Sequence, residues 1–156
     1  MHIHELEIEE CYNLIGIHSA EEDYKIAYLL NRDLNTSFKR FKHNLDFKNK
    51  NASFSVFEFN DEITQLNTYL ISNKYIEDSS ENTNTFGGLF SENISFSSNF
   101  YLIPEKKSVD YFLKLEGEIT TFDLRKLIKK LNTIPQIITS YNINPSTLKS
   151  KDFLIF

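Results

Sequence analysis

The sequence predicts one α+β domain over residues 1–156, in which a predominantly antiparallel β-sheet of about six or seven strands carries two helices packed on one face. Three observations support this fold class. The 14 Phe and 8 Tyr residues favour β structure. Both ends of the chain show a strand, a capped amphipathic helix and a return to strand, whereas the centre is a series of β-rich runs. A chain of 156 residues with only 4 Gly and 3 Pro has the size and composition of a single packed domain.

The first regular unit begins with a short strand at residues 14–17. Ser19 followed by Glu22 forms a capping box, so we expect a helix to begin there and to end near Asn35. Its apolar side chains recur at helical spacing, which predicts packing on the sheet. They include Ala27, Leu30 and Leu34.

The centre of the chain predicts an antiparallel meander with strands at 38–47, 54–59 and 66–75. Residues 78–98 are then rich in Ser, Asn, Thr and Gly, which predicts a mobile loop. An apolar cluster inside this loop either folds back on the core or serves as a docking element, and folding back is the commoner case. The cluster consists of Phe86, Leu89 and Phe90.

The last third predicts strands at 100–103 and 109–115, followed by a helix that begins at Thr120 with Asp123 at the capping position. This helix has an apolar stripe at i, i+3, i+4 and i+7. The stripe consists of Leu124, Leu127, Ile128 and Leu131. A strand should return at 137–143, and residues 153–156 are apolar enough that we expect them to dock on the domain.

Composition points to a cytoplasmic protein. The single cysteine, Cys11, has no partner for an internal disulfide, and the acidic start of the chain is unlike a secretion signal. No stretch of about 18 apolar residues is present, so we expect no membrane association.

Charge is segregated along the chain, because the net charges of residues 1–37, 38–51, 52–118 and 119–156 are −6, +4, −7 and +4. If the two basic segments share a face, they would attract an acidic partner. If they do not, they are ordinary solvated surface. The candidate residues for such a partner are Lys39, Arg40, Lys42, Lys126, Lys129 and Lys130.

A motif occupies residues 103–111, where six side chains have a fixed spacing: Ile103, Pro104, Glu105, Val109, Asp110 and Tyr111. Read physically, the motif is a hairpin connection in which Asp110 accepts hydrogen bonds from the backbone and Tyr111 packs. The alternative is that Glu105 and Asp110 face a partner.

The same residues resemble the signature of the IPExxxVDY family of small bacterial proteins, and residues 12–34 resemble the opening of that family, so the resemblance covers the whole chain. It implies no activity. The genes of that family tend to lie near those for ribonuclease III and an acyl carrier protein. The resemblance therefore implies an acyl carrier protein as an acidic partner.

No catalytic set, metal site or cofactor motif is recognisable, so no catalytic or metal-binding residue and no cofactor is predicted. The chain is therefore more typical of a noncatalytic protein-interaction or assembly factor than of an enzyme. An alternative is a small-molecule-binding domain or enzyme with a pocket between sheet and helices, lined by His18, Asn31, Asp110 or Tyr111.

A second alternative is RNA binding through residues 38–48, where cations alternate with aromatic residues as in proteins that bind single strands. The acidic net charge of −5 and the need for Phe38, Phe41 and Phe47 in the core count against this reading, and no DNA binding is expected.

Overall fold

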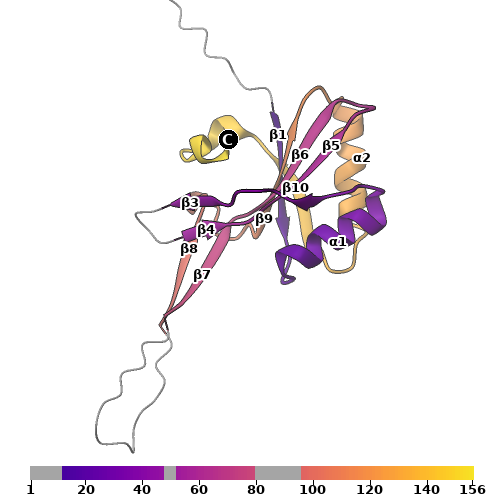
Figure 1. Ribbon diagram of the computed structural model, residues 1–156. Helices are drawn as coiled ribbons and strands as arrows, with labels where there is room; N and C mark the ends of the chain where they lie inside the picture. Colours follow the sequence, from indigo (N-terminus) through magenta and orange to yellow (C-terminus); the bar gives the residue numbers. More distant parts are fainter. Residues whose placement is uncertain (1–11, 48–51, 80–95) are drawn as a thin grey trace, which may run out of the picture.

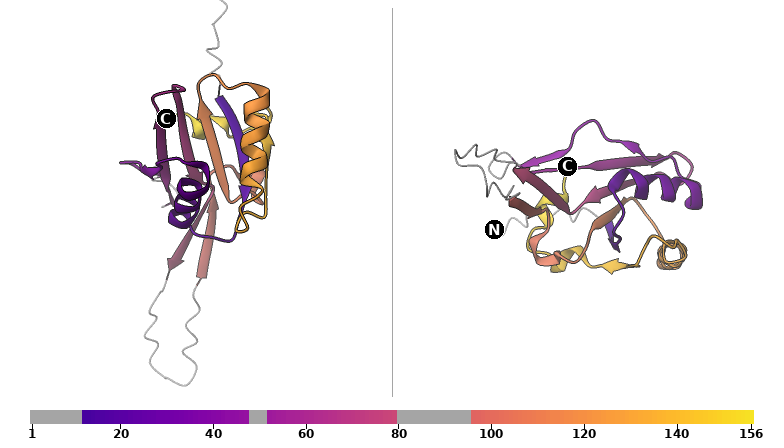
Figure 2. Two further views of the ribbon diagram at one scale, coloured as in Figure 1. Left: turned by 90° about the vertical axis from the view of Figure 1, so that its right-hand side faces the viewer. Right: turned by 90° about the horizontal axis from the view of Figure 1, so that it is seen from below.

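The computed structural model describes residues 12–47, 52–79 and 96–156. Its centre is a six-stranded antiparallel sheet in the order β10-β1-β9-β6-β5-β2 (Figure 1). Both helices lie on one face of this sheet (Figures 1 and 2), which confirms the predicted fold class. The elements are β1 (Tyr12–His18), α1 (Asp23–Leu34), β2 (Lys39–Arg40), β5 (Val56–Asp61), β6 (Leu66–Ser72), β9 (Tyr111–Glu116), α2 (Thr121–Leu131) and β10 (Thr139–Ile143).

Strand alternation gives the sheet two buried faces. On the helix face, β1 contributes Ile15 and Ile17, and β9 contributes Tyr111, Leu113 and Leu115. Apolar residues of the two helices and their flanking segments fill the space above them, including Ile26, Ala27, Leu29, Leu30, Phe38, Leu124, Leu131, Ile134 and Ile137.

The second face of the sheet is covered by short elements instead of helices. They are β4 (Ala52–Phe54), η1 (Pro104–Lys106), η2 (Pro145–Thr147) and η3 (Lys151–Leu154). Leu154 is fully buried there, so the expected docking of residues 153–156 takes place through this side chain. The other buried residues of this face include Leu14, Phe54, Val56, Ile71, Leu102, Ile103, Val109 and Phe112.

The predicted strands of the centre are each divided in two. The run 38–47 forms β2 and β3 (Leu45–Phe47), the run 54–59 falls in β4 and β5, and the run 66–75 spans β6 and the start of β7 (Lys74–Ser79). The chain leaves the main sheet at these breaks and forms two separate ribbons, β3 with β4 and β7 with β8 (Phe96–Tyr101). The predicted single strands were therefore wrong in extent, because a β-rich composition does not show where a strand changes sheets.

The predicted start of α1 was also wrong. The hydroxyl of Ser19 accepts a hydrogen bond from the backbone of Glu21 and donates one to the carbonyl of Gln136, so it caps no helix. The helix begins at Asp23, after a Glu22 whose side chain makes no capping bond. The second helix is capped as predicted, since the hydroxyl of Thr120 accepts a hydrogen bond from the backbone N–H of Asp123 at 3.1 Å.

The expected mobile loop at 78–98 begins and ends in the ribbon of β7 and β8, which extend to Ser79 and from Phe96. The remainder, with Phe86, Leu89 and Phe90, lies outside the described residues, as do His2, His4 and Cys11.

Candidate functional site

The motif residues surround one buried side chain, that of Asn73, which lies between β6 and β7 and is fully buried. Its amide nitrogen donates to the carbonyls of Lys106 (2.9 Å) and Val109 (2.8 Å), and its oxygen accepts from the backbone of Ile103 at 2.8 Å. Its own backbone N–H donates to the carbonyl of Asp110, and its own carbonyl accepts from the backbone N–H of Leu102. Asn73 therefore fixes the path of the chain through the whole motif.

The polar residues at the end of the motif hold the segment that leads into α1. A carboxylate oxygen of Asp110 accepts a hydrogen bond from the backbone N–H of Ser19 at 2.8 Å. The phenol of Tyr111 donates to the carbonyl of Glu21 at 2.6 Å, and burial, with nearby carboxylates such as Asp23, raises the pKa of Tyr111. Both side chains thus make internal contacts that position the loop between β1 and α1.

Glu105 contacts the C-terminal segment. Its carboxylate accepts hydrogen bonds from the backbone N–H and the hydroxyl of Ser150, at 2.7 Å and 3.0 Å. Although desolvation acts in the opposite direction, these bonds lower the pKa of Glu105. The exposed carboxylate of Glu105 therefore anchors residues 150–156 at Ser150, and we call this contact the Glu105 clamp.

This clamp predicts a pH dependence. Because the pKa of Glu105 is lower in the folded protein than its ordinary value of 4.5, its contribution is present above that value and is lost as the pH falls through the folded-state pKa. We expect the hydrogen-exchange protection factors of residues 150–156, which compare each rate with the intrinsic rate at the same pH, to fall in acid, and the Glu105→Gln variant to show most of that loss already at neutral pH. Equal acid sensitivity in both proteins would contradict the assignment.

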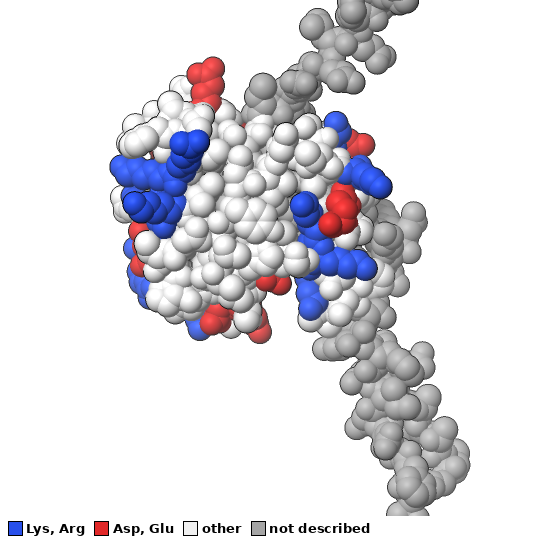
Figure 3. All heavy atoms as spheres, turned by 180° about the vertical axis from the view of Figure 1, so that it is seen from behind, with Lys and Arg blue, Asp and Glu red and all other residues white. Residues whose placement is uncertain are grey.

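The most distinctive surface is one side of α2. Five exposed residues, at positions i, i+3, i+4, i+7 and i+8, form a stripe opposite the buried apolar side of the helix. We call this set the α2 stripe: Phe122, Arg125, Lys126, Lys129 and Lys130. Phe122 is 74% exposed. Figure 3 shows Lys and Arg side chains gathered over this helix at the left of the view.

None of these four cations forms an ion pair with any residue in the described parts of the chain. The helix dipole accounts for Lys129 and Lys130, which lie in the last turn, but not for Arg125 and Lys126. Arg125 with Lys129 and Lys126 with Lys130 are like-charge pairs at i, i+4 spacing, and each pair costs about 0.2–0.5 kcal/mol. In contrast, Lys25 of α1 pairs with Glu21 at 3.1 Å. The helix dipole offsets the like-charge repulsion at Lys129 and Lys130, so the distinctive property of the α2 stripe is positive charge without an ion-pair partner in the described residues.

The structure does not join the two predicted basic segments. Lys39 and Arg40 belong to β2 at one edge of the sheet and Lys42 follows them, whereas α2 packs against β10 at the other edge. Five strand spacings separate the edges by about 24 Å. Arg40 is also engaged, since its guanidinium contacts Asp23 at 3.3 Å and the amide oxygen of Asn44 at 2.7 Å.

Arg40 borders a polar pocket of about 500 Å³ that Tyr111 also lines. A chain of hydrogen bonds crosses it, from Arg40 through Asn44 to Ser53. The hydroxyls of Ser55 and Ser72 bond each other at 2.7 Å in its wall. The charged side chains that line it are of both signs, namely Glu22, Asp23, Arg40 and Lys74.

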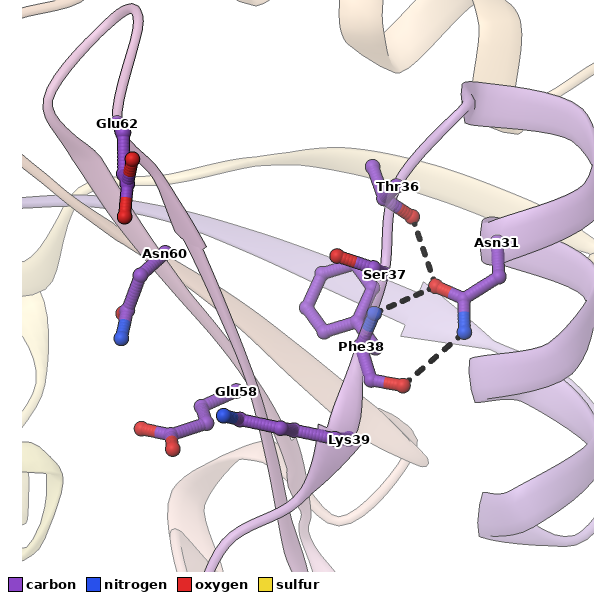
Figure 4. Close-up of a pocket in the computed structure, with 8 residues that line it drawn as sticks. All are labelled: Asn31, Thr36, Ser37, Phe38, Lys39, Glu58, Asn60 and Glu62. Atoms are coloured by element: carbon purple, nitrogen blue, oxygen red, sulfur yellow. Dashed lines mark hydrogen bonds between the residues drawn. The ribbon is translucent and has the colours of Figure 1, made fainter.

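A second pocket, of about 570 Å³, lies between the end of α1 and the strands β2 and β5 (Figure 4). The amide of Asn31 is turned toward the backbone, where its oxygen accepts from Phe38 N–H at 2.7 Å and its nitrogen donates to the carbonyl of the same residue at 3.0 Å. Lys39 and Glu58 lie side by side at its rim. Asn31 therefore ties the helix to β2.

The residues proposed for a pocket between sheet and helices do not converge. His18 bonds the hydroxyl of Tyr141 at 2.8 Å, Asn31 bonds Phe38, and Asp110 bonds Ser19. Apolar side chains fill the space between the sheet and the helices.

The aromatic residues of segment 38–48 do not form an open stacking surface. Phe38 is buried in the helix-face core, and the ring centroid of Phe41 lies 6.2 Å from that of Tyr69. The surroundings of the Phe47 side chain lie outside the described part of the structure.

Sequence reasoning missed Asn73 and two members of the α2 stripe. Asn73 gave no signal, because its partners lie 30–36 residues further along the chain. Phe122 and Arg125 share helical spacing with Lys126 and Lys129, so a projection of the helix could have found them.

Within residues 12–47, 52–79 and 96–156, no group of three or more His, Cys, Asp or Glu side chains is placed to hold a metal ion, and no helix is long and apolar enough to span a bilayer. Comparison of the chain with known protein families, with curated proteins and with solved structures finds no match.

Proposed function

We propose that this protein is a noncatalytic interaction factor that binds an acidic partner protein through the α2 stripe. The observation that carries the proposal is the α2 stripe itself. Its four cations have no ion-pair partner in the described residues, and Phe122 on the same side of the helix is exposed. A row of like charges without a counter-charge in contact on the same domain is available to pair with an acidic partner.

The stripe favours a protein partner over RNA. It presents a single exposed ring at one end and no row of aromatic side chains on which successive bases could stack. A partner with a row of carboxylates beside a small apolar patch would complement both features. An acyl carrier protein has that chemistry, and it is the acidic neighbour implied by the resemblance of the motif to the IPExxxVDY family.

The test replaces Arg125, Lys126, Lys129 and Lys130 by Gln. Because Gln is a good helix former, and the loss of like-charge repulsion offsets the loss of the dipole interaction of Lys129 and Lys130, we expect the free energy of unfolding to change little. We expect affinity for the partner to fall roughly tenfold or more, since each exposed ion pair contributes about 0.2–1 kcal/mol. The measurement is affinity purification of tagged proteins at native expression, with and without nuclease, followed by mass spectrometry.

A matched control has the same number of substitutions in the basic group at the right of Figure 3, around η1 and η3, where acidic residues are interspersed. It changes Lys106, Lys107, Lys149 and Lys151 to Gln. An acidic protein retained by the wild type and by this control, but lost from the α2 variant, supports the proposal. Loss of all partners with nuclease would identify RNA binding instead, and identical partners for both variants would contradict any role of α2.

We also propose that the chain belongs to the IPExxxVDY family and works in the cytoplasm. The support for the first is the complete motif from Ile103 to Tyr111, and for the second the presence of a single cysteine in 156 residues.

A further inference from the structure

Lys114 is the most unusual side chain of the second sheet face. It lies in β9 opposite Leu14 of β1 and Tyr69 of β6, two residues after the buried Phe112, and is fully buried. A buried ammonium is costly unless charge and hydrogen bonds compensate it. Its surroundings should therefore show what holds it there.

Three aromatic rings and one carboxylate surround the ammonium. The Nζ atom lies 4.7 Å from the ring centroid of Phe156, 5.0 Å from that of Tyr12 and 5.9 Å from that of Tyr69. Glu116 approaches it at 2.6 Å, but not along the direction of a hydrogen bond, so within the described residues Nζ has charge compensation without a hydrogen-bond acceptor. The ammonium is thus held by π faces together with the carboxylate of Glu116.

The nearest of these rings, Phe156, comes from the C-terminal segment. It packs edge-on against Tyr69 at 5.1 Å and lies 6.1 Å from the ring of Phe41. Yet 42% of Phe156 is exposed, and its neighbour Ile155 is 48% exposed. Figure 1 shows this segment on the side of the sheet away from the helices.

Residues 150–156 therefore contact the domain as a short peptide ligand would. Leu154 is buried in the apolar face, Phe156 closes over Lys114, and Ser150 bonds Glu105. The end of this segment is only partly covered, since Ile155 and Phe156 keep 48% and 42% of their surface exposed. The tether gives this segment an effective concentration of about the mM range, so a competing segment replaces it where the competitor fills the same site with a higher intrinsic affinity.

We propose that Tyr12, Phe41, Tyr69, Lys114 and Glu116 form a recognition site for a peptide segment with an aliphatic residue followed two positions later by an aromatic residue. In this structure the chain's own Leu154 and Phe156 occupy the site, and a partner chain with a segment of this chemistry would replace them. The site lies on the sheet face opposite α2, so it is independent of the α2 stripe.

The test uses the full chain with Leu154→Ala and Phe156→Ala, so that its own segment competes poorly. A fluorescent peptide with the sequence of residues 150–156 is titrated into this variant and into the wild type, with anisotropy as the readout. We expect at least roughly tenfold tighter binding to the variant, because the intact tethered segment competes in the wild type. The single variant Phe156→Ala, which keeps the buried Leu154, should show the same trend if the double variant unfolds.

Two altered peptides separate recognition from simple stickiness. Replacing the last Phe by cyclohexylalanine keeps its size but removes its π face, and should weaken binding about threefold or more. Replacing the exposed Ile155 by Ala should leave affinity unchanged. No binding to either folded variant, or equal affinity for the phenyl and cyclohexyl peptides, would overturn the proposal. Concentration-dependent dimers of the wild type that vanish in the Phe156→Ala variant would make a second copy the occupant and would likewise overturn it.

Discussion

Replacing Asn73 by Leu should lower the free energy of unfolding by about 3 kcal/mol or more, the largest effect that we expect from a single polar substitution. Leu has nearly the same shape as Asn but makes none of its hydrogen bonds. The backbone N–H of Ile103 and the carbonyls of Lys106 and Val109 would lose their partner, and an orphaned buried group costs about 1–3 kcal/mol. Urea unfolding followed by circular dichroism measures the change.

The control for this prediction is Asn67→Ala, which changes an exposed residue near the start of β6, at the opposite end of the strand from Asn73. A substitution there should change stability by no more than about 0.5 kcal/mol. If Asn73→Leu were equally mild, the motif would not depend on this side chain, and its residues would need another explanation.

The second large effect concerns Lys114. We expect Lys114→Ala to cost about 2–4 kcal/mol, because it removes a buried four-carbon stem and leaves a cavity beneath aromatic rings. Lys114→Met should cost less than about 1 kcal/mol. It keeps most of the stem volume and removes a buried charge, a replacement that is often neutral or stabilising.

The same unfolding measurement compares the two Lys114 variants. Glu116 does not become a buried orphan charge in either, because 34% of its side chain is exposed. A Met variant as unstable as the Ala variant would mean that the ammonium, and not the stem, holds this face together.

Local patterns were sufficient where local interactions decide the structure. The helix at Thr120 follows from a hydroxyl three residues before the N–H that it caps and from an apolar stripe with helical period. An antiparallel sheet follows in the same way from β-rich composition and polar breaks, whereas the limits of its strands and their order do not. These signals are contained within a few residues of the chain.

Other features depend on contacts between distant residues and leave no local signal. Ser19 has the sequence of a helix cap, but its hydroxyl bonds a carbonyl 117 residues away. Lys114 alternates with apolar residues in β9 and so resembles a solvent-facing position of a strand, yet the C-terminal segment covers it. In the same way, the order of strands places the two basic segments at opposite edges of the sheet, although their charge alone would allow them to bind one partner together.

The central claim is that α2 is the contact surface for an acidic protein, and photo-crosslinking in the living cell tests it most directly. Phe122 is replaced by p-benzoylphenylalanine, which suits a ring that is 74% exposed, and the control carries the same group at Tyr24 of α1, which is 63% exposed. We predict a crosslink to an acidic protein from position 122 that is absent from position 24 and disappears when the four cations of the α2 stripe are changed to Gln. Crosslinks of equal strength from both positions, or none from position 122, would contradict the claim.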